Sequence, residues 1–451
     1  MIKAFSAIKK KYLDSTVDLS KLRKTFLLWA VGLVLVYVSN IYLVKITGLE
    51  TYGRYTVFIN WAALISTILL FGWDGYLMQR VPQLPKSENG KIAGSQLLRK
   101  AIRSFYISYI VFAAIVTIVF KVTKIAPQFS SNQYLVFFLL LIFLFAAITF
   151  FKAFLKIFNV INKVQWAEDV AKPLFLFIIV LIYYNAGTAL TLSSLYWINC
   201  FAFGSIAVLF LFFAIKTYQR NFEVQQNVAA DEKWLVKCFY FMCIFLGYSI
   251  FSRMELLFLG HYAKDEDAAK YQILLRIADL VILPDFLFNY FLPQKFAHHF
   301  ANGKNDEAKQ LFKNSSVTIF LLQVICFAGV GAVGYFYLQS FNIASNQMFL
   351  FLLLMAIAPI FYSLFGSSNL VLKTSGNERY SFYALLIVLV LELAANYLFT
   401  ATYGLVAAVI ISVTSIFLYT LLLSFFVYKK LQFYTTVTRI LFFVNTAKAA
   451  T

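Results

Sequence analysis

Apolar stretches of roughly 20 residues recur along the whole chain, and only short polar segments separate them. That is the length an α-helix needs to cross the hydrocarbon layer of a bilayer. Inside this layer the chain must satisfy its own backbone hydrogen bonds, which favours helices. We therefore predict an all-α polytopic membrane protein with about 12 transmembrane helices. The expected spans are 26–46, 55–79, 102–120, 133–151, 171–187, 193–215, 236–260, 270–292, 315–338, 347–371, 380–400 and 403–427.

The composition excludes a soluble globule. Hydrophobic residues make up 61% of the chain and charged residues 13%, whereas soluble domains contain about 25% charged residues. Too few polar side chains are present to coat a water-exposed surface. The polar segments between the spans are too short to form a separate soluble domain.

The net charge of +19 raises the question of a nucleic-acid partner. Most of the 39 lysines and arginines, however, fall at or between one set of span ends. This asymmetry is the positive-inside rule, and it predicts that both termini are cytoplasmic. Attraction to anionic membrane lipid is a second role for these charges, and no nucleic-acid partner is expected. The basic residues on the opposite, outer side are Lys45, Arg54, Lys121, Lys124, Lys264 and Lys270.

A short repeat indicates that the chain has two halves. "ETYGRY" (Glu50–Tyr55) leads into the second span and "EDAAKY" (Glu266–Tyr271) into the eighth, six spans later. Parallel repeats of this kind are common in secondary transporters, which bind substrate between the halves. The expected organisation is a basic segment (1–25), an N-lobe of spans 1–6 (26–216), a cytoplasmic linker (217–235), a C-lobe of spans 7–12 (236–428) and a cytoplasmic tail (429–451).

Charged residues occur inside the apolar runs. "YSIFSRMELLFLGHY" (248–262) contains Arg253 and Glu255, and the next span contains Arg276 and Asp279. At ~1.5 Å per residue these groups lie roughly 10 Å below the outer surface. Each charge costs about 2.5–3.5 kcal/mol on insertion, so we expect them to pair or to line a water-filled cavity. Candidate substrate-binding residues in this layer are Arg253, Arg276, Glu255, Asp279, Asn60 and Asn40.

Two further acids are candidates for ion coupling, Glu392 in span 11 and Asp285 in span 8. Each has a structural alternative. Asn396 follows Glu392 by one turn and could satisfy it, and Asp285 follows Pro284, where a hinge is expected. Arg276 and Asp279 could likewise form an ion pair along one helix at i, i+3.

No metal, cofactor or catalytic site is expected. The four cysteines form no C-x-x-C pair and the three histidines are scattered. "GVGAVG" (329–334) fits G-x-G-x-x-G, but it lies inside an apolar span with no preceding strand, so helix packing explains it better than nucleotide binding.

Four stretches carry a resemblance to a known family. They are "GLETYGRYTVF" (48–58), "SRMELLFLGHY" followed by "YQILLRIADLVILP" (252–284), "VLKTSGNERY" (371–380) and "TYGLVAAVIIS" (402–412). Together they resemble the polysaccharide flippases of the MOP exporter superfamily, which is related to MATE exporters and the lipid II flippase. The resemblance implies two six-helix lobes around a central cavity, and alternating access. The substrate would be an undecaprenyl-pyrophosphate-linked oligosaccharide, such as an O-antigen or exopolysaccharide repeat unit, in a bacterial inner membrane. Other polysaccharide-assembly membrane proteins would be partners.

The residues leave two other functions open. A MATE-like exporter of organic cations would use Glu392, Asp279 and Asp285 as coupling acids. A membrane glycan polymerase or glycosyltransferase would need a long outer loop or paired carboxylates, and here the outer loops are short, with one acid cluster at 265–267. We expect a transporter rather than an enzyme, because the outer loops are short. We expect a flippase rather than a cation exporter, because arginines bind a pyrophosphate through paired, charge-assisted hydrogen bonds.

Overall fold

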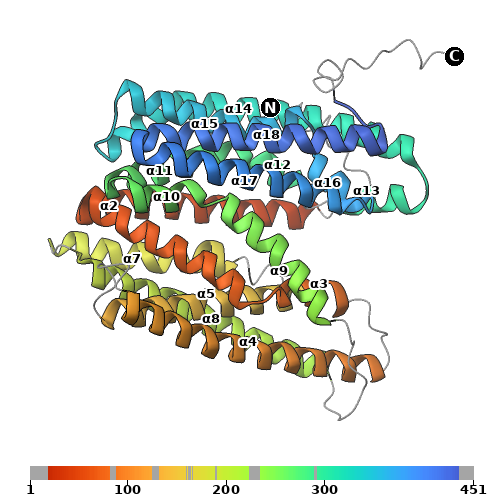
Figure 1. Ribbon diagram of the computed structural model, residues 1–451, viewed down its shortest axis with the longest axis horizontal. Coiled ribbons are helices and arrows are strands. Elements are labelled where there is room, and N and C mark those ends of the chain that lie inside the picture. Colours follow the sequence, from red (N-terminus) through yellow and green to blue (C-terminus); the bar gives the residue numbers. More distant parts are fainter. Residues whose placement is uncertain are drawn as a thin grey trace.

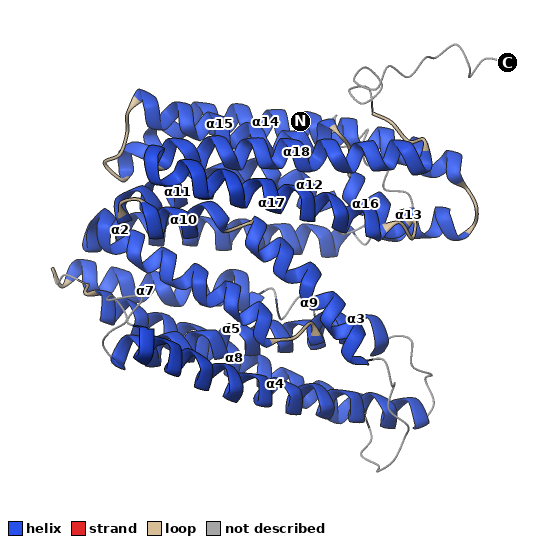
Figure 2. Cartoon of the chain, in the orientation of Figure 1, coloured by secondary structure: helices blue, strands red, loops and turns tan. Residues whose placement is uncertain are grey.

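The computed structural model describes residues 19–81, 88–123, 132–158, 160, 164, 166–187, 190–222, 234–288 and 292–435. Within these ranges the regular structure is helical (Figure 2), and nine helices are long and apolar enough to cross a membrane. The predicted all-α polytopic membrane fold is confirmed. The expected basic segment, linker and tail lie largely outside the described residues.

The N-lobe starts with one long helical element that holds the first two predicted spans. This element, α2, is interrupted at Gly48, whose φ of 77° and ψ of 165° are non-helical. Only glycine adopts this conformation readily, so the break divides α2 into two helices that diverge (Figure 1). The elements of this half are α2 (Leu19–Leu69), α3 (Trp73–Arg80), α4 (Glu88–Thr123), α5 (Asn132–Ile157), the π-helix η3 (Trp166–Ala171), α7 (Lys172–Asn185) and α8 (Leu192–Asn221).

The C-lobe contains more and shorter elements than six continuous spans. Span 7 divides at Arg253, span 8 passes through a 3₁₀ turn, and span 10 divides near Gly366, whose φ is 79°. Pro284 follows the 3₁₀ turn and cannot donate a backbone hydrogen bond. The elements are α9 (Trp234–Phe251), α10 (Met254–Tyr262), α11 (Asp265–Ala278), η4 (Asp279–Ile282), α12 (Leu283–Phe288), α13 (Leu292–Ala301), α14 (Asn305–Ser340), α15 (Asn346–Leu364), α16 (Ser368–Thr374), α17 (Glu378–Tyr403) and α18 (Leu405–Leu431).

Each lobe has its own apolar core, and a third core joins them. The first core lies in the N-lobe and includes Phe137 and Phe154, and another lies in the C-lobe and includes Phe312 and Tyr419. The joining core packs residues of α2, such as Tyr52, against α11. In Figure 1 the first part of α2 accordingly lies between the two groups of helices, and α9 crosses from α3 to the C-lobe.

Large apolar side chains also cover the outside of the bundle. So many exposed apolar side chains would be unfavourable in water, and they fit a surface in contact with lipid. Examples on α8 and α14 are Phe201, Val208, Phe212, Val333 and Phe336.

Candidate functional site

The two copies of the sequence repeat meet at one end of the bundle. We call this the outer end, because the charge asymmetry predicts that it faces away from the cytoplasm. The first copy forms an i, i+4 ion pair between Glu50 and Arg54, and the second forms one between Glu266 and Lys270. The repeat therefore has a structural counterpart in both lobes.

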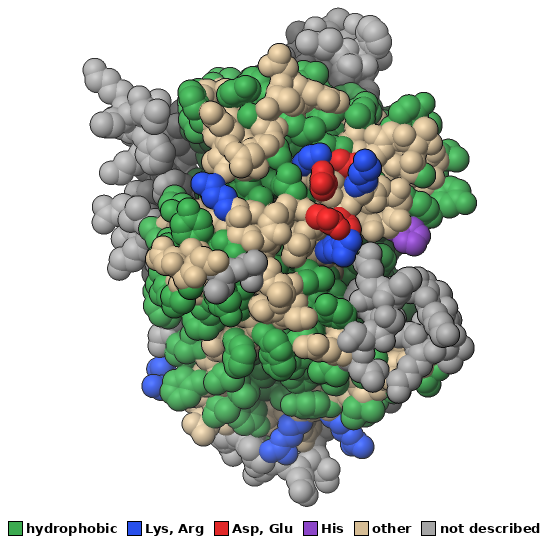
Figure 3. Space-filling view, turned by 90° about the vertical axis from the view of Figure 1, so that its left-hand side faces the viewer, with side chains coloured by type: hydrophobic (Ala, Val, Ile, Leu, Met, Phe, Trp, Pro, Cys, Tyr) green, Lys and Arg blue, Asp and Glu red, His purple; other side chains and the backbone are tan. Residues whose placement is uncertain are grey.

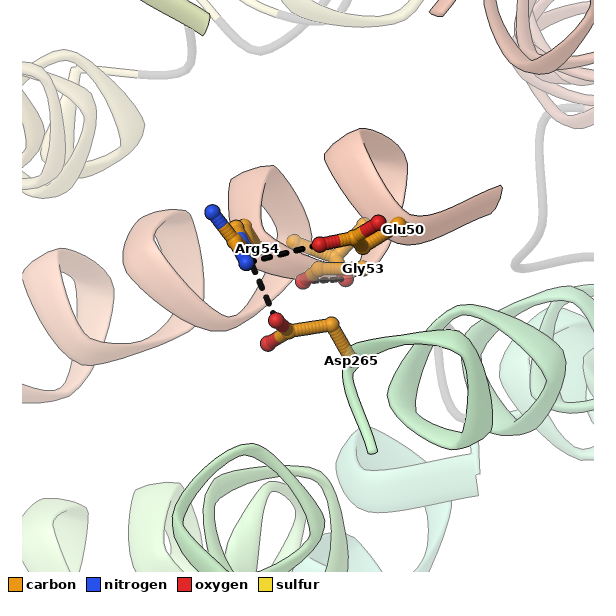
Figure 4. A network of polar contacts seen from close by, with 5 residues as sticks. Glu50, Gly53, Arg54 and Asp265 are labelled. Atoms are coloured by element: carbon orange, nitrogen blue, oxygen red, sulfur yellow. Dashed lines mark hydrogen bonds and ion pairs between the residues drawn. The ribbon is translucent and has the colours of Figure 1, made fainter. Parts of the chain in front are cut away.

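Close backbone contact seals the outer end. A Cβ atom on Gly53 would lie 1.8 Å from the carbonyl oxygen of Asp265, so only glycine allows α2 and α11 to approach this closely. Arg54 bridges the lobes there, 2.7 Å from Glu50 and 2.7 Å from Asp265 (Figure 4). Figure 3 shows the acidic and basic side chains gathered on this face. In this structure the lobes are in contact at the outer end.

Arg253 lies at the break between α9 and α10. Its φ of −135° and ψ of −5° end one helix and begin the next. The guanidinium donates to the hydroxyls of Ser249 and Ser252, each at 3.0 Å, and to the Ser249 carbonyl at 3.3 Å. The side chain is half-buried, and its partners are neutral.

Arg276 lies on the last turn of α11, surrounded by tyrosines of both lobes. Its charge interacts with four of them, while its own side chain is solvent-accessible. The Tyr37 hydroxyl donates to the Arg276 carbonyl, and the Tyr337 hydroxyl oxygen is buried without a hydrogen-bond partner. The neighbours of Arg276 therefore come from both lobes. The tyrosines are Tyr37, Tyr52 and Tyr55 of α2 and Tyr337 of α14.

The expected pairing between the arginines and acids of this layer is not made. In the part of the chain that the structure describes, no ion pair within 4.0 Å joins Arg253 to Glu255 or Arg276 to Asp279. The like charges of Arg253 and Arg276 act on each other unfavourably, and the charge of Arg276 also acts on Asp279 without forming an ion pair. Asp279 is exposed at the start of η4. Neither arginine is therefore in an ion pair with a carboxylate within the described residues.

Glu255 lies next to Glu392 rather than next to an arginine. The two side chains are 3% and 2% exposed, and their carboxyl groups are close enough to share a proton. A carboxylate has only acceptors, so one member of such a pair must carry a proton. The Asn396 amide donates to the backbone carbonyl of Glu392 at 3.0 Å, and the Glu392 Oε2 atom has no partner. The alternative that Asn396 satisfies the Glu392 carboxyl group is therefore wrong.

The remaining candidates lie apart from one another. Asn60 donates to the Thr56 carbonyl of its own helix at 2.8 Å, and Asn40 is half-buried on the first part of α2. Asp285 lines a pocket of about 280 Å³ in the C-lobe, together with Lys373 and Tyr362. Glu392 does not line this pocket, so the two proposed coupling acids belong to different places.

Two groups of residues in the bundle are not singled out by the sequence. The tyrosines are not distinguished among 28 tyrosines by any local pattern. The other group is three lysines on α5 and α7, Lys152, Lys156 and Lys172, which lie at the ends of two expected spans. Glu168 on η3 pairs with Lys152 and is the signal that the sequence offers, since a Lys–Glu pair at the margin of two spans is costly unless it is buried together.

Comparison with known proteins gives the fold. No family model matches the chain, and no curated protein matches it in sequence. Among solved structures, it is similar to an inward-facing multidrug resistance MATE family transporter of the MOP superfamily, with a TM-score of 0.65 and 12% identity over 90% of this chain and 98% of that one. The outward-facing conformation of a MATE transporter gives 0.59 and 11%, covering 91% and 95%.

The lipid II flippase MurJ in an inward closed conformation is also similar. Its TM-score is 0.60 at 12% identity, and the match covers 89% of this chain and 87% of that one. At such low identity these likenesses show the fold and not the substrate. The chain therefore has the fold of the MOP-superfamily transporters, as the sequence resemblance implied.

Proposed function

We propose that this protein is a flippase that moves an undecaprenyl-pyrophosphate-linked oligosaccharide from the cytoplasmic to the outer leaflet by alternating access. The observation that carries this proposal is the pair of interior arginines. Arg253 and Arg276 interact with each other and neither is bonded to a carboxylate. Two like charges that act on each other are unfavourable without a counter-charge. A ligand with two negative charges removes that cost.

A pyrophosphate diester suits this arrangement chemically. Its two phosphate groups accept paired hydrogen bonds from guanidinium groups. The tyrosines around Arg276 offer hydroxyl groups and ring faces, which bind sugars by hydrogen bonding and stacking. In the inward-facing state the headgroup would enter from the cytoplasm. Separation of Gly53 from Asp265 would then open the outer end and release it.

The carboxyl pair suits a role in ion coupling. Glu255 and Glu392 come from α10 and α17, so they join the broken span 7 to span 11. Loss of the shared proton would leave two buried carboxylates in contact, which repel each other. Such a pair would part when it releases its proton, and α10 begins directly after Arg253. We propose that protonation of this pair is linked to the conformation of the arginine site.

An ion-coupled exporter of organic cations is the alternative, and the likeness to MATE transporters supports it at the level of fold. The charge of the site opposes it, since a cationic substrate would be repelled by two arginines. We further propose a bacterial inner-membrane location with cytoplasmic termini, and polysaccharide-assembly proteins as partners, both following from the sequence resemblance and the charge asymmetry.

The test is translocation in proteoliposomes. We expect wild-type protein to move a fluorescent undecaprenyl-pyrophosphate-linked oligosaccharide. We expect Arg253→Ala to lose at least about 90% of this rate, a tenfold fall that corresponds to about 1.4 kcal/mol of lost interaction energy. Arg220→Ala, which removes an exposed arginine at the end of α8, is the matched control and should retain the rate. An imposed proton gradient should change the wild-type rate and not that of Glu392→Gln.

Transport of an organic cation by the same vesicles, without oligosaccharide movement, would replace the flippase proposal with the exporter. Equal rates for wild type and Arg253→Ala would remove Arg253 from the binding site. A Glu392→Gln protein that still responds to the gradient would remove the carboxyl pair from coupling.

A further inference from the structure

A pocket of about 280 Å³ lies within the C-lobe, and the described residues that line it all come from that lobe. They belong to α12, α13, α16 and α18 and to the end of span 10. Figure 1 shows α13 and α16 at the end of the C-lobe away from the start of α11, which is the inner end. The Lys373 side chain in the lining is exposed, whereas Ser368 and Leu423 are buried. The pocket therefore opens beside Lys373, toward the inner end.

The break in span 10 shapes this pocket. Helix α15 ends at Leu364 and α16 begins at Ser368, with Gly366 at a φ of 79° between them. A Cβ atom on Gly366 would overlap the Phe312 ring, so only glycine lets the break pack against α14. The hydroxyl of Ser367, which precedes α16, makes no hydrogen bond that caps this helix. The break thus places a hydroxyl group in the lining that the helix does not use.

Asn369 offers a hydrogen-bond donor to the pocket that it lines. Its Oδ1 atom accepts from the Ser381 hydroxyl at 2.6 Å and from the Tyr248 hydroxyl at 3.3 Å. The Tyr248 hydroxyl oxygen is also 2.9 Å from that of Tyr419. These contacts fix the orientation of the amide, and no described residue accepts a hydrogen bond from its nitrogen. The amide nitrogen is therefore available to a ligand.

The lining contains further donors and acceptors. Lys373 supplies an ammonium, which lies 4.8 Å from the centre of the Tyr248 ring in a cation–π contact. Asp285 supplies a carboxyl group. The Thr420 hydroxyl donates to the Ile416 carbonyl at 2.9 Å, so its oxygen can still accept a hydrogen bond. A ligand in this pocket thus meets donors and acceptors together.

A neutral, polyhydroxylated ring fits this lining better than an ion does. The described lining holds one acid and one base, Asp285 and Lys373, so their formal charges cancel. Lys373 would repel a metal cation, and Asp285 would repel an anion. A sugar hydroxyl both donates and accepts, which suits the mixed polar groups. Tyr362, Leu370 and Leu423 add apolar surface for the C–H groups of a sugar ring, and small-molecule sites combine such walls with a few polar groups.

Tyr248 connects the pocket with the arginine site. It contacts Asn369 and Lys373 of the lining, and it precedes Arg253 along α9 by roughly 8 Å at ~1.5 Å per residue. The next residue, Ser249, accepts a hydrogen bond from the Arg253 guanidinium. The pocket therefore lies on the inner side of Arg253. An oligosaccharide held at Arg253 by its pyrophosphate reaches the pocket when its sugars extend toward the inner end.

We propose that this pocket binds one sugar ring of the transported oligosaccharide, with Asn369 and Lys373 as donors and Asp285 as an acceptor. The inference rests on the proposed flippase function and adds a site that selects the sugars. The two sites would then recognise different parts of one substrate. The arginines would bind its charge, which is common to lipid-linked substrates, and the pocket would bind the part that differs between them.

Binding to full-length protein in lipid nanodiscs tests the proposal. The probes are an undecaprenyl-pyrophosphate-linked oligosaccharide, undecaprenyl diphosphate, and the same oligosaccharide without lipid. Ser367→Phe fills the pocket without removing a capping bond, and we expect it to weaken binding of the lipid-linked oligosaccharide about tenfold. Binding of undecaprenyl diphosphate should not change, because this probe has no sugar.

A second variant tests the donor directly. Asn369→Asp keeps the oxygen that accepts from Ser381 and Tyr248 but replaces the donor with an acceptor, so we expect a similar loss. Asn302→Ala, which removes an exposed asparagine after α13, is the matched control and should bind like the wild type. Thermal unfolding of each purified variant verifies the fold.

A protection measurement tests the pocket with a smaller change. In a background without native cysteines, the lipid-linked oligosaccharide should protect Ser367→Cys from a maleimide, and undecaprenyl diphosphate should not. Unchanged binding in both pocket variants, or absence of this protection, would overturn the sugar site and leave the flippase proposal standing. Free oligosaccharide bound as tightly as the lipid-linked form would overturn the assignment to the transported substrate. A wild type that neither binds nor moves the lipid-linked oligosaccharide would overturn the proposed function itself.

Discussion

Arginines at two levels of the molecule have opposite surroundings. Arg54 at the outer end is 43% exposed and lies 2.7 Å from each of two carboxylates. Deeper in the bundle, Arg253 has neutral hydrogen-bond partners and Arg276 has tyrosine neighbours. The charges of these two arginines also act on each other. Arg54 is thus neutralised by carboxylates in contact with it, whereas within the described residues neither Arg253 nor Arg276 forms an ion pair. We interpret unpaired arginines within predicted spans as candidates for ligand binding rather than as structural ties.

Helix geometry explains why nearby acids do not neutralise the interior arginines. Glu50 and Arg54 are four residues apart and share a helix face, whereas Arg253 and Glu255 are two apart and do not. Arg276 and Asp279 are three apart, but α11 ends between them and the chain tightens into the 3₁₀ turn η4. An arginine with an acid two to four residues away therefore forms an ion pair in one case and none in the other two.

The largest effect should come from the interior arginine. Arg276→Ala removes a charged group that faces both lobes, and we expect the translocation rate to fall at least about 100-fold, the value of about 2.7 kcal/mol. Arg276→Lys should recover only part of this rate, because an ammonium lacks the planar fork of a guanidinium. The measurement is oligosaccharide translocation in proteoliposomes, normalised to inserted protein.

The contrast between paired and unpaired arginines would be contradicted if Arg276→Ala retained more than half of the wild-type rate. Full recovery by Arg276→Lys would contradict the two-pronged contact and leave only a general charge effect.

The outer seal should show the next largest effect. Gly53→Val places methyl groups where the Asp265 carbonyl lies, so the lobes cannot close and the outward-facing state should dominate. Val57, which packs against Gly260 inside the seal, provides the reporter. In a background without native cysteines, Val57→Cys should react with an impermeant maleimide in the Gly53→Val protein and be protected otherwise. Gly204→Ala, a helical glycine with open space around it, should leave the protection unchanged.

If Val57→Cys is protected from the maleimide equally with and without Gly53→Val, the contact between Gly53 and Asp265 is not the seal. Added substrate would then also leave the protection unchanged, as expected for a rigid contact and not for a moving one.

Much of the architecture follows from apolar run length, and little of the site does. The spans and the two lobes are set by stretches long enough to cross a bilayer and by one repeated motif. The Glu255–Glu392 pair joins spans 7 and 11, and nothing in either span specifies which faces meet. The π-turn next to Lys172 has no compositional signature. A sequence states which side chains are polar in the membrane, while helix rotation and breaks decide which of them meet.

The smallest effect should come from the outer ion pair. Exposed pairs contribute about 0–1 kcal/mol, so Arg54→Ala should change translocation only a few-fold, and less at high salt, which screens exposed charges. A double-mutant cycle with Asp265→Ala isolates the contact between lobes from the Glu50 contact within α2. We expect a small coupling energy between Arg54 and Asp265 when the protection of Val57→Cys is measured. The exchanged pair, Arg54→Asp with Asp265→Arg, should recover part of this protection. An Arg54→Ala variant as impaired as Arg276→Ala would mean that neutralised and unneutralised arginines matter alike, because opening the outer end would then limit the rate.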